Sequence, residues 1–135
     1  MSRLPDRDYS HRTLLEKLGV RSGQRIAALN VSDAAFLDDV SRTAGESIST
    51  VLRGTYDLIF LQVNEARDLG RIPKAASHLQ AAGALWIFHP KGKNAAVKEG
   101  EVRTAYLACG VVDNKVSAFT ETHTATRCVI PRVKR

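Results

Sequence analysis

Short runs of almost unbroken apolar residues alternate along this chain with stretches in which apolar residues recur every three or four positions. The clearest run covers residues 56–63, and a second one, at residues 84–89, stops at Pro90. Runs of this kind are typical of strands in a parallel sheet, because helices cover both faces of such a sheet. The pattern predicts strands at residues 25–30, 47–52, 56–63, 84–89, 111–119 and 122–130.

The stretches between these runs have the spacing of amphipathic helices. The first helix is expected to begin after Asp8 or Ser10 and to end at Gly19. Pro73 interrupts a longer helical stretch and predicts a break near Arg71, because proline clashes with the preceding turn of a helix. The other helices are predicted at residues 34–44, 64–80 and 95–109.

This order predicts one α/β domain that spans residues 1–135, a length close to the commonest size of a single domain. Strands that alternate with helices form parallel sheets with right-handed crossovers. Only Thr120 and Glu121 link the last two strands, and so short a link requires an antiparallel hairpin. We therefore expect a Rossmann-like fold: a mostly parallel sheet of about six strands, helices on both faces and a C-terminal antiparallel β-hairpin.

The charge of the chain bears on its partners. Twenty Lys and Arg against 14 Asp and Glu give a formal net charge of +6. Apart from a basic tail at residues 132–135 and a cluster at residues 91–98, the positive charges lie among carboxylates. Diffuse basic charge more often serves solubility than recognition, so nucleic acid is not the expected partner.

Other features narrow the class of protein further. No apolar run approaches the ~20 residues of a membrane-spanning helix, and the N-terminus lacks the apolar stretch of a secretion signal. Cys109 and Cys128 do not have the spacing of metal ligands. We therefore expect a cytoplasmic protein without membrane contact, bound metal or cofactor. No motif identifies a catalytic residue, so the sequence leaves open whether the protein is an enzyme.

Three stretches resemble the class I S-adenosylmethionine (SAM)-dependent methyltransferase fold. Tyr56-Asp-Leu-Ile-Phe60 looks like a central strand of that fold, and Ala81-Ala-Gly-Ala-Leu-Trp-Ile87 is similar to the helix end and strand that come next. Ala108-Cys-Gly-Val-Val112 resembles the helix end that precedes its two closing strands. The resemblance implies a shortened version of the same fold.

The chain is also similar, over most of its length, to an uncharacterised bacterial family known as a domain of unknown function. A tryptophan usually follows the matching threonine in that family, whereas this chain has His123. The family brings no established activity. The matching positions are Lys17-Leu-Gly-Val-x-x-Gly23, Trp86-x-x-x-Pro-Lys91, Gly110-Val-Val-Asp-Asn-Lys-Val116, Thr122 and Arg127.

The resemblance to methyltransferases fails where the cofactor should bind. After its first strand that fold needs a Gly-x-Gly turn, which lets the backbone approach the cofactor closely. Residues 29–35 contain no glycine. An acidic residue should also end the second strand and bind the ribose, but residues 52–54 are Leu-Arg-Gly. A SAM site of the usual kind is therefore not expected.

Candidate ligand-binding residues follow from the expected sheet, since ligands of open α/β sheets bind beyond the carboxyl ends of the strands. Ser32 and Asp33 could hold an anion at a helix N-terminus, but the simpler reading is that one of them caps that helix. The loop from His89 to Lys93 could hold a small anion such as a phosphate or carboxylate, or could be a solvated basic turn. The candidates are Asn30, Ser32, Asp33, Asn64, His89, Lys91 and Lys93.

Two further expectations concern the hairpin. Asp113 is expected to pair with Arg127 across it. Residues 122–130 carry few charges that would protect an edge strand from pairing with another chain, which predicts a homodimer through that strand.

The leading functional hypothesis is a degenerate, non-catalytic methyltransferase-like module that binds a ligand or a protein. The first alternative is a small enzyme with an altered SAM or nucleotide site. The second is a non-specific nucleic-acid binder that uses the basic tail and the region from Lys91 to Lys98. Its affinity would fall steeply with salt.

Overall fold

A computed structural model describes residues 13–135, and every structural statement below refers to this part of the chain. One mixed sheet has the strand order β1-β2-β3-β5-β4. The first three strands are mutually parallel, whereas β5 is antiparallel to both of its neighbours. The strands are β1 (Ile26–Leu29), β2 (Tyr56–Gln62), β3 (Leu79–Pro90), β4 (Val112–Ala118) and β5 (His123–Val129).

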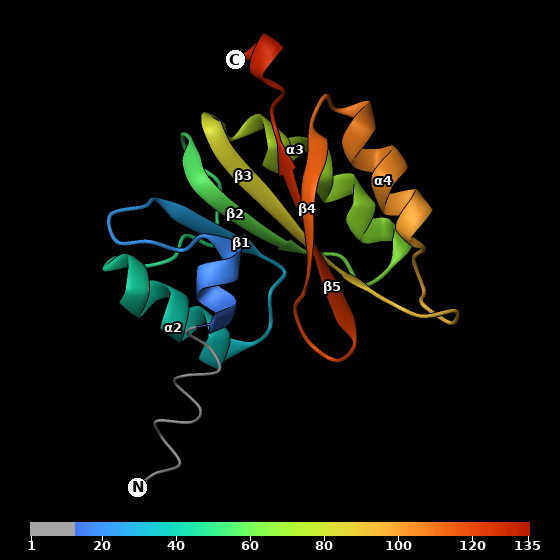
Figure 1. Ribbon diagram of the computed structural model, residues 1–135, viewed down its shortest axis with the longest axis horizontal. Coiled ribbons are helices and arrows are strands. Elements are labelled where there is room, and N and C mark those ends of the chain that lie inside the picture. The colour runs from blue at the N-terminus through green and yellow to red at the C-terminus, as the bar shows by residue number, and fades with distance from the viewer. Residues whose placement is uncertain (1–12) are drawn as a thin grey trace, which may run out of the picture.

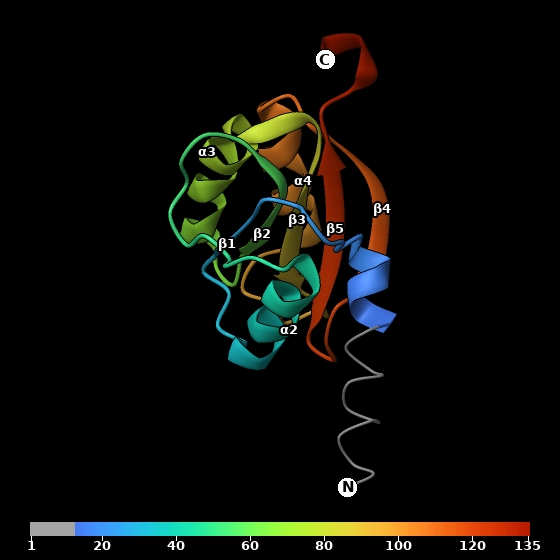
Figure 2. The same ribbon diagram turned by 90° about the vertical axis from the view of Figure 1, so that its left-hand side faces the viewer.

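Helices cover both faces of this sheet. A helix over residues 13–18 and α2 (Ala34–Ala44) lie on one side, and α3 (Ile72–Ser77) and α4 (Glu99–Ala108) lie on the other (Figures 1 and 2). A 3-10 helix, η1 (Ala66–Arg71), leads directly into α3, and a second one, η2 (Arg132–Lys134), follows β5. The predicted α/β, Rossmann-like fold with a C-terminal hairpin is confirmed. None of the helices formed by residues 13–135 is long and apolar enough to span a membrane.

The predicted number of six mostly parallel strands is wrong, because the run at residues 47–52 contributes one bridge rather than a strand. Ser49 exchanges two backbone hydrogen bonds with β1, of 2.8 and 3.0 Å. The chain then turns back: the Tyr56 hydroxyl donates to the Val51 carbonyl (3.1 Å) and accepts from the Arg53 N–H (3.0 Å). This turn carries the chain to the far side of β1, where β2 begins.

The two faces of the sheet form two separate cores. Trp86 on β3 is fully buried on the side of the 13–18 helix, and its indole N–H donates to the Leu18 carbonyl (2.9 Å). Ile87, the next residue, is buried against the side that carries α3 and α4. Alternate residues of these strands thus face opposite cores, which explains why the central strands are apolar throughout.

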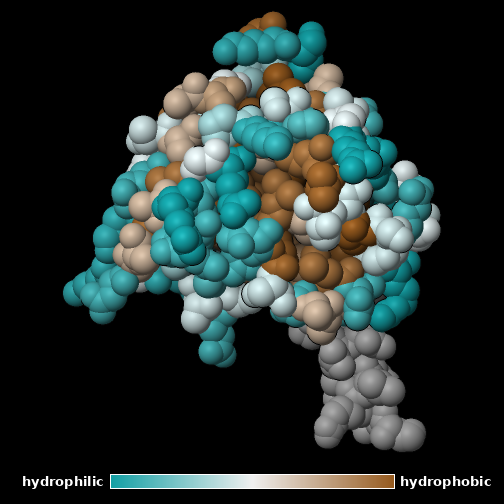
Figure 3. All heavy atoms as spheres, turned by 180° about the vertical axis from the view of Figure 1, so that it is seen from behind, coloured by the Kyte–Doolittle hydropathy of each residue, from teal (hydrophilic) through white to brown (hydrophobic). Residues whose placement is uncertain are grey.

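The face with α3 and α4 also carries a hollowed hydrophobic area bordered by hydrophilic side chains (Figure 3). Half-buried Leu29, Leu52 and Leu69 pack against the core on this side, and the Val51 side chain is 60% exposed. Since α3 and α4 pack over β2 and β3, the end of the sheet at β1 is less covered.

Several predicted boundaries shift. The break near Arg71 is confirmed, since η1 ends there and α3 begins with Pro73 in its first turn. β3 begins earlier than predicted, and Gly83 within it is required because a Cβ there would lie 2.8 Å from the Tyr56 carbonyl oxygen. α4 begins only at Glu99, because residues 91–98 form a loop. The proposed caps Asp8 and Ser10 lie outside the described residues.

Two inferences about the hairpin are wrong, the edge position of residues 122–130 and the pairing of Asp113 with Arg127, whereas a homodimer stays a prediction. β5 lies inside the sheet between β3 and β4, so β4 and not residues 122–130 is the edge strand. Asp113 forms its ion pair with Arg103 of α4 (3.1 Å), not with Arg127. The strand order explains the first error, because it places β5 between β3 and β4. The register of the hairpin explains the second: Asp113 lies opposite Cys128 and Arg127 opposite Lys115, so the side chains of Asp113 and Arg127 face opposite sides of the sheet.

Candidate functional site

The carboxyl ends of β1, β2 and β3 meet at one edge of the sheet, because these strands are parallel. The chain leaves β1 to place Ser49 on one side of it and then returns to place β2 on the other. Such a reversal is the position at which open α/β sheets bind ligands. The candidates Asn30, Asn64 and His89 all lie at this edge, as predicted from the strand ends.

A polar cavity of about 450 Å³ lies at the reversal itself, and we call it the switch-point cavity. Side chains from the loop after β1, from the loop after β2 and from η1 form its walls. Its charged residues include two arginines and two carboxylates. The lining residues are Asn30, Asn64, Glu65, Arg67, Asp68 and Arg71.

Asn30 closes the crevice between β1 and β2. Its backbone has φ 61°, a left-handed conformation in which asparagine is among the few tolerated residues besides glycine. Its side-chain amide donates to the Gln62 carbonyl at the end of β2 (2.9 Å). A side-chain hydrogen bond within the protein therefore spans the place where a SAM-binding fold would have a glycine turn without side chains.

Asp68 organises the rest of this cavity. One of its carboxylate oxygens accepts the backbone N–H groups of Asn64 (3.0 Å) and Glu65 (3.2 Å), and Arg71 lies 3.7 Å from the other. The carboxylate is buried, so these donors compensate for its lost hydration. Arg67 pairs with Glu65 at 3.0 Å. The charges of the cavity are thus already matched by one another.

His123 connects this cavity to the hairpin. Its Nε2 lies 2.8 Å from the Asn64 side-chain oxygen and its Nδ1 lies 2.8 Å from the Thr122 hydroxyl. Because the amide oxygen only accepts, Nε2 carries the proton and the Thr122 hydroxyl donates to Nδ1. Burial, with a smaller contribution from the charge of Lys91, lowers the pKa of His123 below its ordinary value.

Ser32 and Asp33 line neither the switch-point cavity nor the two cavities beside α4. Asp33 is the N-cap of α2 and accepts a hydrogen bond from the Phe36 N–H (3.1 Å). The prediction that one of these two residues caps the helix is confirmed. Ser32 is exposed beside it.

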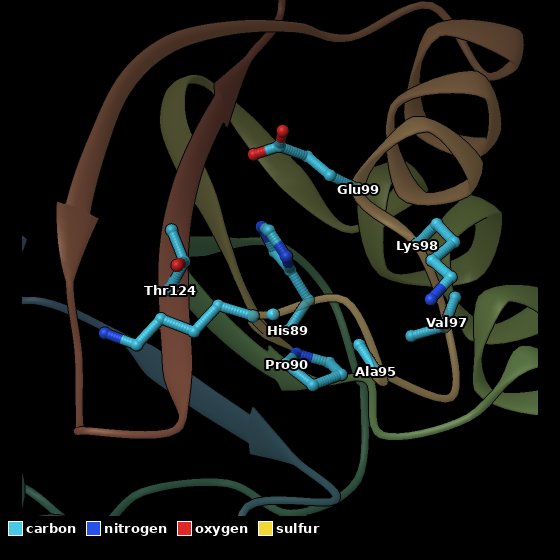
Figure 4. Close-up of a pocket in the computed structure, with 9 residues that line it drawn as sticks. His89, Pro90, Ala95, Val97, Lys98, Glu99 and Thr124 are labelled. Atoms are coloured by element: carbon cyan, nitrogen blue, oxygen red, sulfur yellow. The ribbon is translucent and has the colours of Figure 1, made fainter.

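A second hollow lies under the N-terminus of α4, on the side of the sheet that carries α3 and α4. It consists of two neighbouring cavities, of about 220 and 270 Å³, which share His89 and Glu99 as walls. We call the pair the His89 trough. In Figure 4, His89 and Glu99 both point into the space between α4 and β5.

His89 has one ring nitrogen paired and one unpaired. The side chain is only 2% exposed, and its Nε2 lies 2.8 Å from the Thr126 hydroxyl of β5. Nδ1 is buried without a hydrogen-bond partner among residues 13–135. Leaving such an atom unpaired costs about 1–3 kcal/mol, so native structures rarely tolerate it without a reason.

The protonation of His89 follows from the same surroundings. Burial lowers its pKa below the ordinary value, and the nearby Glu99 carboxylate only partly offsets this. The imidazole is therefore neutral at pH 7, and it offers one donor nitrogen and one acceptor nitrogen.

A chain of polar groups that runs from buried Tyr106 to half-buried Asp113 and exposed Arg103 forms the far end of the trough. The Tyr106 hydroxyl bonds to Asp113, and burial together with this bond raises the pKa of Tyr106 to about 12. The same bond, the Asp113 backbone and Arg103 lower the pKa of Asp113. Sequence reasoning missed Glu99, Thr126 and this chain, because they come together only through the packing of α4 and β5 on β3.

The two predicted lysines have different surroundings. Lys91 is exposed and lines the smaller cavity of the trough together with His89. Lys93 contributes its backbone, since its carbonyl accepts from the Lys98 ammonium and so holds the loop in shape. The trough therefore brings His89 and Lys91 together, but Lys93 is not among the residues that line it.

Neither metal binding nor thiol chemistry is indicated. No group of three or more His, Cys, Asp or Glu side chains within residues 13–135 is arranged to hold a metal ion. Cys128 is buried, and burial raises its pKa to about 12, so its thiol is not activated as a nucleophile.

Comparison with known proteins identifies the fold. No protein-family model matches the chain, and no curated protein matches it by sequence. Solved structures of methyltransferases do resemble it. A SAM-dependent methyltransferase from Aquifex aeolicus superposes with a TM-score of 0.64 at 11% identity, over 90% of this chain and 89% of the other.

Two further structures agree. A TehB-like SAM-dependent methyltransferase from Corynebacterium glutamicum has a TM-score of 0.60 at 13% identity, over 90% and 87% of the two chains. An O-methyltransferase family protein from Burkholderia thailandensis has a TM-score of 0.65 at 14% identity, over 87% of this chain and 54% of that one. At such identities the likeness shows the fold: this chain has the α/β, Rossmann-like fold of SAM-dependent methyltransferases.

Proposed function

We propose that this protein is a non-catalytic, methyltransferase-like binding module in which protein side chains close the usual SAM position. The hydrogen bond from the Asn30 amide to the Gln62 carbonyl is the observation that carries this proposal. SAM needs a glycine turn there so that the backbone can approach it, and Asn30 instead fills the space with its own side chain.

The missing ribose partner supports the same conclusion. An acidic residue at the end of the second strand would accept hydrogen bonds from the ribose hydroxyls. Here that strand is one bridge at Ser49, and the chain turns back at Val51 to Arg53. The residues present do not fit SAM, so no reaction step through it is derived.

The switch-point cavity favours one alternative, a small enzyme with an altered SAM or nucleotide site. Its volume of about 450 Å³ is within the range of small-molecule sites. Its charges, however, are paired within the protein: Arg67 with Glu65, and Arg71 with Asp68. A ligand would have to break these pairs, and for this reason we place the alternative second.

A thermal titration of the full chain with SAM distinguishes the two functions. A ligand at about 100 times its dissociation constant adds about 2.7 kcal/mol, which would raise Tm by about 10 °C in a domain of this size. We expect no saturable rise at millimolar SAM. A saturable rise, followed by methyl transfer from labelled SAM, would establish the enzyme instead.

A pair of variants tests whether Asn30 is the obstacle. Asn30→Gly removes the closing side chain and suits the left-handed backbone. We expect it to bind SAM more tightly than the wild type. Asn94→Gly makes the same substitution in the exposed 91–98 loop, and we expect it to leave SAM binding unchanged. Equal behaviour of the two variants would show that the Asn30 side chain does not close the site.

A further inference from the structure

The His89 trough contains a buried polar atom for which residues 13–135 supply no partner. That atom is Nδ1 of His89, and the His89 and Glu99 side chains line both cavities of the trough and point into the same space (Figure 4). The trough and the switch-point cavity share no lining residue, so a ligand of one does not imply a ligand of the other.

Thr126 decides which nitrogen of His89 carries the proton. The Thr126 hydroxyl can donate to Nε2 at 2.8 Å, which leaves the proton on Nδ1. The negative charge of Glu99 acts on the same ring and partly offsets the effect of burial on the pKa of His89. The trough then presents a donor, Nδ1–H, beside an acceptor, the Glu99 carboxylate.

We propose that the His89 trough binds a small neutral molecule through a lactam or carboxamide edge. Such an edge carries a carbonyl oxygen and an N–H group side by side. The carbonyl accepts from His89 Nδ1–H, and the N–H donates to the Glu99 carboxylate. Both polar groups of the trough are then satisfied by one ligand.

The surrounding charges favour a neutral ligand. An anion at Nδ1 would meet the Glu99 carboxylate, so the small anion expected from the sequence of the 89–93 loop does not suit the deep part of the trough. A cation would meet Lys91, Lys98 and Arg103, which line the two cavities.

The size and walls of the trough indicate a single small ring. Its cavities, of about 220 and 270 Å³, lie below the roughly 300–1,000 Å³ of sites for drug-sized ligands. Val97 lines one of them, and Val102 and Val116 line the other. Apolar walls around a few polar groups are the usual composition of small-molecule sites.

Nitrogen NMR of histidine-labelled full-length protein tests the proposal directly, with uracil and nicotinamide as probes. Uracil carries the lactam edge, whereas 1,3-dimethyluracil has the same ring without an N–H group. We expect uracil to shift the His89 Nδ1 resonance saturably and 1,3-dimethyluracil to bind at least about tenfold more weakly, the ratio for one lost hydrogen bond of about 1.4 kcal/mol. If neither uracil nor nicotinamide shifts this resonance at about 10 mM, the proposal is wrong.

Two variants separate recognition by Glu99 from general charge effects. Glu99→Ala should weaken uracil binding by about tenfold, because the ligand N–H loses its acceptor. Glu121→Ala removes the same charge at the exposed turn of the hairpin and should leave the affinity unchanged. Equal affinities in both variants would overturn the assignment of Glu99.

Inorganic phosphate provides the final comparison. We expect it to leave the His89 Nδ1 resonance unchanged. A saturable shift with phosphate that survives Glu99→Ala would replace the neutral ligand with the small anion expected from the sequence. Since SAM takes no part in these titrations, their failure leaves the proposed closure at Asn30 intact.

Discussion

The switch-point cavity and the His89 trough lie at the same edge of one sheet, yet they differ in whether their polar groups have hydrogen-bond partners within the protein. Around the first, Asn30, Asn64 and Asp68 each have a partner within the protein. In the second, His89 Nδ1 has none among the described residues. The polar groups of the switch-point cavity have partners within the protein, whereas the neighbouring trough contains a polar atom without a hydrogen-bond partner.

This difference indicates what each region does. Paired polar groups in the switch-point cavity stabilise the loops after β1 and β2. An unpaired buried atom lowers stability, and departures from local satisfaction of this kind concentrate at functional sites. Binding capacity is therefore expected in the trough rather than in the switch-point cavity.

The largest expected effect tests the structural role of the switch-point cavity. Asp68→Ala leaves the N–H groups of Asn64 and Glu65 without their acceptor, so the free energy of unfolding should fall by about 2–3 kcal/mol. Urea denaturation measures the change. Arg67→Ala, which breaks the exposed pair with Glu65, serves as the control and should cost no more than about 0.5 kcal/mol. Similar losses in the free energy of unfolding in both variants would show that Asp68 does not stabilise these loops more than an exposed ion pair does.

A smaller change in stability is expected in the trough. The effect of replacing Thr126 depends on whether His89 is present. Thr126→Val removes the side-chain hydrogen bond between Thr126 and His89 Nε2 and should lower the free energy of unfolding by about 1–2 kcal/mol. Adding His89→Leu removes the imidazole as well, so the double variant should be close to the wild type in stability. A double-mutant cycle by urea denaturation measures this coupling. Additive losses would show that His89 contributes packing rather than an unmet polar group.

The smallest effect concerns pH. Because the folded state depresses the pKa of His89, the unfolded state binds protons more readily. The free energy of unfolding should therefore fall as the pH drops below about 6.5, the ordinary pKa of histidine. His123 contributes in the same direction, and its share remains in the double variant that lacks His89. Measured against that variant, the wild type should show the steeper loss; parallel curves would argue against a buried neutral His89.

The sequence predicted the features that depend on local pattern. Apolar runs located the central strands, the short Thr120–Glu121 link located the hairpin, and the strand ends located Asn30, Asn64 and His89. A helix cap at Ser32 or Asp33 was predicted for the same reason, since capping depends on neighbouring residues, and the structure assigns it to Asp33. These inferences need no knowledge of which strands pair.

What the sequence could not predict depends on the order of strands. Thr126 meets His89 only because β5 pairs with β3, and Asp113 meets Arg103 only because α4 packs near β4. Residues 47–52 have the composition of a strand, but the turn back at Tyr56 limits them to one bridge. Tertiary packing overrode the local preference in each case.

Trp86 gives the molecule a built-in optical reporter. It is the single tryptophan of the chain, and its fully buried indole is held by the Leu18 carbonyl of the 13–18 helix. Detachment of that helix would expose the indole to water and shift its fluorescence to longer wavelength, even while the sheet stayed intact. Emission and far-ultraviolet circular dichroism would then follow two different events, and a mismatch between their transitions would reveal a partly unfolded state.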